Sequence, residues 1–368
     1  MRRLRSVQSP GHRVLVALAV AAGMVALAII SAHVAHAAGS GSTSTTPIGS
    51  DPSAPPWSVL DPKSDETRPV LTLFIIVGVE SLIVFLLVCA ALFINITRFS
   101  HKPGQDAEPK QLYGNRRLEI LWTIIPAVIL LIGFIATVVV MVEIAEPADA
   151  ASALTIDVTG HQWWWEFHIP SAHVTTANAL QIPDNRLVRF DITSADVVHD
   201  FWSPELFVQV NATPNITTTL YTDHPSLGIY PGGCYQFCGP GHAWMQFRIE
   251  VDTPSQFAAW VKHEAKPIED THLSNLALEG EGVFLDHSCG ACHTINGLPS
   301  AHGTFAPNLT HVGSRWGIAG GVLAMSIPNL ERWVTNPDQW KEGAKMPAFG
   351  FLTPSQLHDL ATFLYEAK

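Results

Sequence analysis

The stretch Cys234-Tyr235-Gln236-Phe237-Cys238-Gly239-Pro240-Gly241-His242-Ala243-Trp244-Met245 places two thiols, an imidazole and a thioether in one short segment, and its glycines and proline require a loop. A mononuclear copper site uses one Cys, two His and a weak Met ligand. Here two cysteines lie four positions apart, so two sulfurs can bridge two ions. His199, thirty-five positions before Cys234, is the best candidate for a second imidazole. The pattern predicts a dinuclear copper site with these ligands: His199, Cys234, the main-chain carbonyl of Gln236, Cys238, His242 and Met245.

Two other interpretations use the same cysteines. A short Cys234–Cys238 disulfide would persist outside the cytoplasm, but it leaves His242 and Met245 without a role. A Cys2His2 zinc site has little use for Met245, because a soft thioether favours copper. Copper is therefore the preferred prediction.

The loop resembles the dinuclear copper (CuA) loop of cytochrome c oxidase subunit II, whose pattern is Cys-x-Glu-x-Cys-Gly-x-x-His-x-x-Met. The one departure is Gln236 in place of Glu. The resemblance implies that this residue binds copper through its main-chain carbonyl, so the copper centre is expected to tolerate the change. In the family the Glu carboxylate also reaches a magnesium ion at the interface with subunit I. A neutral amide is a weaker ligand for a hard cation, which leaves that magnesium site open here.

Length and composition point to a membrane protein with several domains. The chain has 368 residues, 47% of them hydrophobic, and a mean hydropathy of +0.21. Its net charge of −11, with no basic stripe, argues against a nucleic-acid partner. Residues 1–37 combine an arginine-rich start, an apolar run and Ala35-His36-Ala37, which predicts a secretory signal peptide, with a retained anchor as the alternative. Residues 38–68 are a Gly/Ser/Pro-rich linker.

Two apolar segments predict a transmembrane hairpin. Residues 69–97 and 118–143 are each long enough to cross a bilayer. The loop between them, 98–117, carries more basic than acidic residues and is therefore expected in the cytoplasm. Both outer ends of the hairpin, and the whole chain after it, then lie outside the cytoplasm.

Two acidic residues belong to these segments. Glu80 lies near the middle of the first, and we expect it to be neutral or partnered. Glu119 stands at the cytoplasmic end of the second, before Trp122 and Pro126, and by its chemistry alone is an ordinary interfacial acid. The family resemblance adds that an acid at this place marks the mouth of a proton channel leading into subunit I.

Residues 152–256 show short alternating runs rich in Val, Ile, Thr, Phe and Trp, which predict an all-β sandwich or Greek-key barrel. The resemblance makes this domain a CuA cupredoxin. The run Gly160-His161-Gln162-Trp163-Trp164-Trp165 resembles the family's Gly-x-Gln-Trp-Tyr-Trp, whose first Trp lies between the copper centre and the incoming donor. Trp163 is therefore expected to be the residue at which electrons arrive.

A linker at 257–272 and a C-terminal domain at 273–368 follow. Cys289-Gly290-Ala291-Cys292-His293 is a haem c attachment motif: Cys289 and Cys292 form thioethers and His293 is the proximal iron ligand. Met346, followed by proline, resembles the distal ligand of class I cytochromes c and is preferred over Met325. The domain is expected to be all-α.

The resemblance covers residues 69–368 and is to subunit II of a caa3-type oxidase. It implies that electrons pass from haem c to CuA and on to the haems of subunit I, where oxygen is reduced to water with proton translocation. The implied partners are subunit I, other oxidase subunits, and an upstream donor such as cytochrome c or another respiratory complex. The expected location is a bacterial plasma membrane, with the copper and haem domains on its extracytoplasmic side.

Three other functions share parts of this pattern. A quinol oxidase subunit should lack both the cysteine pair of the loop and the haem motif. A free-standing redox carrier would not need the hairpin. A nitric-oxide-reducing enzyme could use the same electron-accepting subunit and stays open at this point.

Overall fold

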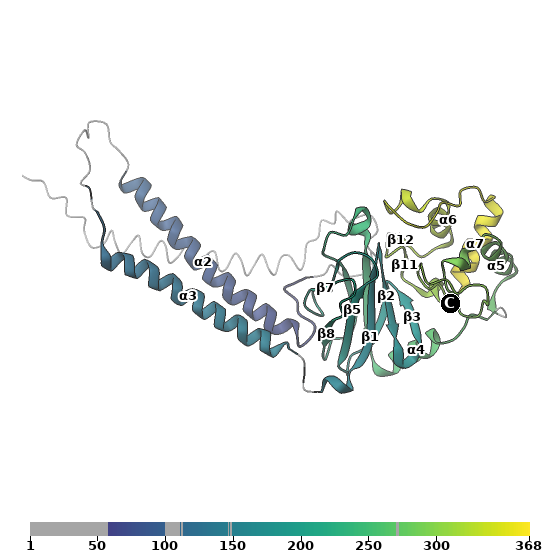
Figure 1. Ribbon diagram of the computed structural model, residues 1–368, viewed down its shortest axis with the longest axis horizontal. Coiled ribbons are helices and arrows are strands. Elements are labelled where there is room, and N and C mark those ends of the chain that lie inside the picture. Colours follow the sequence, from purple (N-terminus) through teal and green to yellow (C-terminus); the bar gives the residue numbers. More distant parts are fainter. Residues whose placement is uncertain (1–57, 100–110, 112, 146, 148, 270–271) are drawn as a thin grey trace, which may run out of the picture. The chain divides into compact units, whose positions relative to one another are not determined.

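The computed structural model describes residues 58–99, 111, 113–145, 147, 149–269 and 272–368 (Figure 1). All of these belong to one compact unit, Gly49–Lys368. The predicted signal peptide, most of the linker at 38–68 and most of the loop at 98–117 lie outside the described residues.

Two long apolar helices form the N-terminal part of the described chain. They are α2 (Thr67–Arg98) and α3 (Arg116–Glu143), and each exceeds the roughly 20 residues that span a bilayer. The two helices pack against each other, and the Glu80 carboxylate faces Gly133 of α3, 3.3 Å from where a Cβ would lie. Most other side chains along both helices are apolar and exposed, as a membrane-spanning pair requires.

The helix α3 begins with a reciprocal cap. The Asn115 side chain accepts a hydrogen bond from the Leu118 amide at 3.2 Å, and the Glu119 carboxylate accepts one from the Asn115 amide at 3.2 Å. Each bond satisfies an amide that has no partner within the helix. Glu119 therefore has a structural role at this helix end, whatever else it does.

The middle of the chain is a two-layered β sandwich, the β domain (Figure 1). One sheet has the order β3-β2-β1-β5-β8, with bounds β1 (Leu154–His161), β2 (Trp164–Ile169), β3 (Val174–Ala177), β5 (Val188–Ser194) and β8 (Thr218–Thr222). The other has the order β4-β10-β9-β6-β7, with bounds β4 (Ala179–Pro183), β6 (His199–Trp202), β7 (Val210–Ala212), β9 (Gly228–Cys234) and β10 (Gln246–Asp252). The predicted all-β architecture is confirmed.

Alternation along the strands creates the core between the sheets. In β1 and β5 every second side chain is buried, as the period of a strand dictates. Aromatic rings fill the centre: Phe201 stacks on Phe247 with centroids 4.5 Å apart, and Trp165 meets Phe201 edge-on at 5.1 Å. This rigid core supports the strand ends that carry the candidate ligands.

A helix, α4 (Pro254–Glu264), follows β10 and occupies the first part of the segment expected as a linker. Thr253 and Gln256 form a capping box at its start. Phe257, Trp260 and Val261 pack on the β core, so the chain stays attached to the β domain up to this point.

The C-terminal domain contains three helices among its described residues, packed around a separate core (Figure 1). They are α5 (Asn275–Asp286), α6 (Ile327–Thr335) and α7 (Pro354–Glu366), with a small hairpin of β11 (Gly317–Ile318) and β12 (Leu323–Ala324). Short 3-10 turns complete the described chain: η1 (Ala150–Ser152), η2 (Pro170–Ala172), η3 (Pro240–Trp244), η5 (Cys289–Ala291), η6 (Val312–Ser314) and η7 (Pro337–Gln339). The helical domain is as predicted, apart from this short hairpin.

The contact between α5 and α7 depends on one glycine. A Cβ at Gly280 would overlap the backbone carbonyl of Asp359, whereas a Cβ at Gly282, two residues later, would meet nothing within 4 Å. We expect Gly280→Ala to lower the free energy of unfolding by about 1–3 kcal/mol through forced separation of the helices. Gly282→Ala is the matched control and should be neutral or slightly stabilising. Amide hydrogen exchange in α5 and α7 measures the loss of stability in Gly280→Ala relative to Gly282→Ala. Equal protection of these helices in the two variants would contradict the prediction.

Candidate functional site

The candidate copper ligands gather where β6 and β9 pair. Cys234 is the last residue of β9 and pairs with Phe201 of β6. His199, the first residue of β6, lies two residues before Phe201. The Cys234 amide donates to the Met245 carbonyl at 3.0 Å, which closes residues 234–245, the copper loop, onto β10. Residues distant in sequence thus meet because of strand register.

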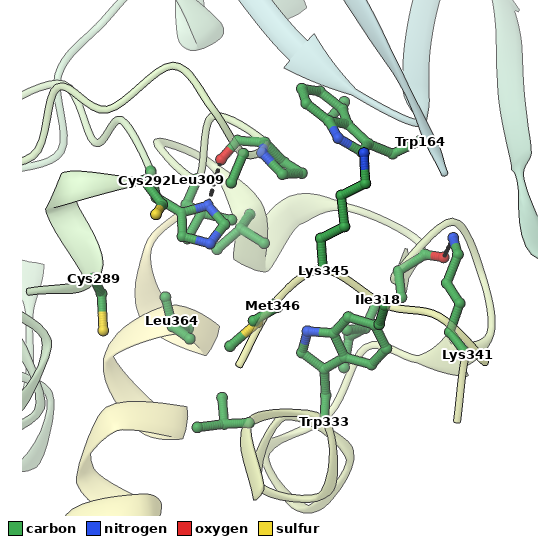
Figure 2. Close-up of a pocket in the computed structure, with 18 of the residues that line it drawn as sticks. Trp164, Cys289, Cys292, Leu309, Ile318, Trp333, Lys341, Lys345, Met346 and Leu364 are labelled. Carbon is green, nitrogen blue, oxygen red and sulfur yellow. Dashed lines mark hydrogen bonds between the residues drawn. The ribbon is translucent and has the colours of Figure 1, made fainter. Parts of the chain in front are cut away.

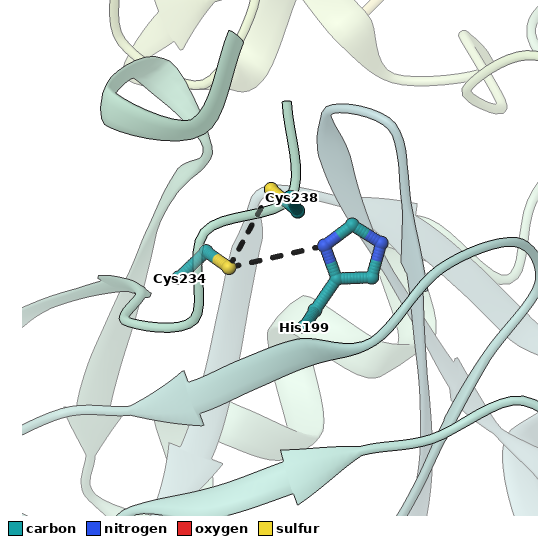
Figure 3. A group of neighbouring side chains, drawn as sticks. All are labelled: His199, Cys234 and Cys238. Atoms are coloured by element: carbon teal, nitrogen blue, oxygen red, sulfur yellow. Dashed lines mark hydrogen bonds between the residues drawn. The ribbon is translucent and has the colours of Figure 1, made fainter. Parts of the chain in front are cut away.

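The sulfur of Cys234 is the centre of one half of the site. It lies 3.8 Å from His199 Nδ1, 3.2 Å from the Gln236 carbonyl oxygen and 3.8 Å from Cys238 Sγ (Figure 3). The distance between the sulfurs is less than twice the ordinary metal–thiolate length of about 2.3 Å, so both can contact a common ion.

The sulfur of Cys238 is the centre of the other half. His242 Nδ1 lies 3.6 Å from it and Met245 Sδ lies 3.9 Å from it. Each thiol therefore has its own imidazole, and the two halves share the sulfur pair. The structure brings all six predicted ligands together, and both cysteines are free thiols in it, which does not favour the disulfide interpretation.

The two buried thiols share their protons unequally. The hydrogen bond between the two thiols lowers the pKa of Cys234 and raises the pKa of Cys238. Cys234 is therefore the first of the pair to lose its proton, and a metal cation would displace the other proton. A buried site with two sulfurs, two imidazoles and a thioether suits copper better than zinc.

Asp196 fixes the orientation of His199, and the sequence analysis did not identify it. Its carboxylate accepts from His199 Nε2 at 2.8 Å and from the Gln162 amide at 2.7 Å. This bond directs Nδ1 of the imidazole toward Cys234, as carboxylates commonly do for metal-binding histidines. The spacing of three residues before His199 was the available signal.

Trp163 lies against the copper loop. Its indole Nε1 donates to the Cys238 carbonyl at 3.0 Å, and the side chain is 7% exposed. Gly239 and Gly241 allow this approach, because a Cβ on either would lie within 2.8 Å of the indole. The next residue, Trp164, instead stacks on His161 with ring centroids 4.1 Å apart.

A cavity of about 360 Å³ is lined by the predicted haem-attachment residues of the C-terminal domain. Cys289, Cys292 and Met346 face it (Figure 2), and His293 lines it as well. His293 Nδ1 is 2.7 Å from the Pro307 carbonyl, and burial lowers the pKa of the imidazole. The neutral ring then keeps Nε2 free to bind iron.

The cavity also fits the charge of a haem. Arg315 lines it with a half-buried side chain, and its buried Nε has no hydrogen-bond partner among the described residues. A guanidinium with an unpaired N–H suits a carboxylate such as a haem propionate. Met346 lines the cavity and Met325 does not, which agrees with the preferred ligand.

Three family patterns match this chain. They are the transmembrane domain of cytochrome c oxidase subunit II at 69–140, the periplasmic domain of that subunit at 170–252, and cytochrome c at 277–368.

Relatives match over most of the chain. Cytochrome c oxidase subunit 2 of Alkalihalophilus pseudofirmus is 32% identical over 315 residues, covering 84% of this chain and 91% of the relative. The protein of the same name from Bacillus sp. (strain PS3) is 32% identical over 287 residues, covering 73% and 80%. The crystal structure of the periplasmic domain of subunit II of cytochrome oxidase from Bradyrhizobium japonicum is 29% identical, covering 31% of this chain and 94% of that one, with a TM-score of 0.30.

Proposed function

The chain belongs to the cytochrome c oxidase subunit 2 family, and from that premise we propose that it carries electrons from a covalently bound haem c to a dinuclear CuA centre and on to the haems of subunit I. Oxygen is reduced to water in subunit I, with proton translocation. The observation that carries the proposal is the cluster of four donors around the sulfur pair Cys234–Cys238, which makes six donors in all.

The copper loop would supply the chemistry of the relay. The donors that would hold a pair of copper ions are His199, Cys234, the main-chain carbonyl of Gln236, Cys238, His242 and Met245. Bound there, the pair would supply a centre that takes up one electron from the haem side and releases it to subunit I, with no bond made or broken. The rigid β scaffold limits movement of the ligands during the transfer, which favours speed.

The C-terminal domain would hold the haem through Cys289, Cys292 and His293, and Met346 would supply a second ligand to its iron. Methionine ligation raises the reduction potential of a haem, which suits a donor to copper. An upstream respiratory protein would reduce this haem.

The hairpin would place the chain in a bacterial plasma membrane beside subunit I and other oxidase subunits. The basic loop at 98–117 would then face the cytoplasm and both redox domains the opposite side. Presence of both the cysteine pair and the haem motif argues against a quinol oxidase subunit.

Copper content tests the proposal. We expect the purified full-length chain to bind two copper ions with a mixed-valence paramagnetic resonance spectrum. Cys238→Ser should lose that spectrum because one bridging sulfur is gone. Cys89→Ser is the matched control, since Cys89 is exposed on α2, and it should behave as the wild type. A single bound ion, or a preference for zinc, would refute the dinuclear site.

The haem ligand is tested by two methionine substitutions. We expect Met346→Leu to abolish the absorption band typical of methionine-ligated ferric haem and to lower the haem potential, because the thioether no longer binds iron. Met325→Leu should leave both unchanged. Retention of the band in Met346→Leu would assign the ligand elsewhere.

Trp163 is proposed as the residue at which electrons arrive at the copper centre. Trp163→Phe removes the hydrogen bond to the Cys238 carbonyl, so electron transfer to copper should slow several-fold while copper content stays the same. Trp260→Phe, on α4 away from the loop, serves as the control. Stopped-flow reduction measures both, and equal rates would remove the role.

Glu119 is proposed as the mouth of the proton channel, and one substitution separates this from its role as a helix cap. Glu119→Gln keeps an acceptor for the Asn115 amide but removes the charge. We expect slower proton uptake by the assembled oxidase with no change in helix stability. Undiminished uptake would leave Glu119 as a cap alone.

A further inference from the structure

A buried lysine of the C-terminal domain is bound to the β domain. Lys341 has 4% exposure, and its ammonium donates to three main-chain carbonyls: Trp163 at 2.6 Å, Trp244 at 2.9 Å and Ala319 at 2.8 Å. The first two acceptors belong to the β domain and the third to the C-terminal domain. One side chain therefore joins both domains.

The acceptors lie next to the copper site. Trp244 precedes the candidate ligand Met245, and the indole of Trp163 is bonded to the Cys238 carbonyl. Burial lowers the pKa of Lys341 to about 7, which reflects the cost of removing a cation from water. The three carbonyls offset that cost only while the two domains stay in contact.

Other contacts surround this lysine. A Cβ at Gly343, in the same loop (residues 340–346), would lie 2.7 Å from the ring of Trp163. Lys345 Nζ is 3.6 Å from Asp196, the carboxylate that orients His199. The loop that ends at the candidate haem ligand Met346 thus contacts the ring of Trp163, which also packs on the copper loop.

We propose that Lys341 is a positioning residue that holds the C-terminal domain against the surface of the β domain formed by Trp163 and Trp244 of the same chain. This surface, the Trp163 face, is then closed to any separate donor protein. The inference rests on the proposed function and identifies the partner of this surface as the chain's own haem-bearing domain. A separate redox protein would then deliver its electron to the C-terminal domain, because Trp163 is covered. Covalent attachment keeps the local concentration of the covering domain high, and Lys341 fixes its orientation.

Oxidative footprinting of the full chain, loaded with copper and haem, tests the inference. Hydroxyl radicals should leave Trp163 protected in the wild type. In Lys341→Met we expect modification of Trp163 to rise at least about threefold, because the two domains separate locally. Trp165, fully buried in the β core, is the internal reference and should not change. Lys262→Met, an exposed lysine on α4, is the matched control and should equal the wild type.

A second variant covers the case in which Lys341→Met fails to fold. Gly343→Asn keeps the loop backbone, since asparagine tolerates the φ of +80° at this position, but its side chain would collide with the Trp163 ring. It should expose Trp163 in the same way. Protection of Trp163 in either variant, with copper and haem spectra intact, would overturn the inference.

The proposed function and the proposed role of Lys341 are tested by different measurements. Copper content and spectra of the wild type judge the proposed function, whereas protection of Trp163 judges the contact between domains. The distribution of distances between the copper centre and ferric haem, measured by paramagnetic resonance, provides a second readout. This distribution should broaden in Lys341→Met and stay unchanged in Lys262→Met.

Discussion

The pairing of β6 with β9 is the constraint on which the rest of the molecule depends. It places His199 beside Cys234, and the return of the loop to β10 places Cys238, His242 and Met245 within reach of the same sulfur pair. The donor atoms are held by backbone register and by a packed aromatic core, so the site has little freedom to rearrange. A centre that changes charge without changing shape requires this kind of support.

The sequence predicted the parts of the site that are local. The loop at 234–245 and the motif at 289–293 each hold several ligands within a few residues, so spacing alone carries the information. The fold brings His199 beside Cys234, where the predicted ligand set requires it, although the two residues are thirty-five positions apart and the strand pairing that joins them is not encoded by spacing. The two apolar helices followed from the length of their apolar runs and the strands from alternation, and both signals report one element at a time.

Two charged residues were not predicted. Asp196 lies only three residues before His199, but that spacing alone does not show that its carboxylate orients the imidazole. Lys341 is an ordinary charged residue in the sequence, and only the fold shows that it is buried among carbonyls of distant segments. The helix α4 was missed for another reason. Only one face of this helix is apolar, and that face packs on the β domain. Over eleven residues such a weak amphipathic pattern is hard to distinguish from that of a polar linker.

Trp163 connects these observations. Its indole requires glycines in the copper loop and a further glycine, Gly343, in the loop that ends at Met346, so both loops are shaped around the same ring. Its Nε1 reaches the Cys238 carbonyl, while its own carbonyl accepts from Lys341. A residue with these four constraints packs both domains together, and it also lines the cavity of the predicted haem-binding residues while it bonds to the copper loop. The side chain that holds the domains in contact is therefore also the one that reaches both candidate sites, and a change that loosens the contact must disturb the arrangement of the two sites.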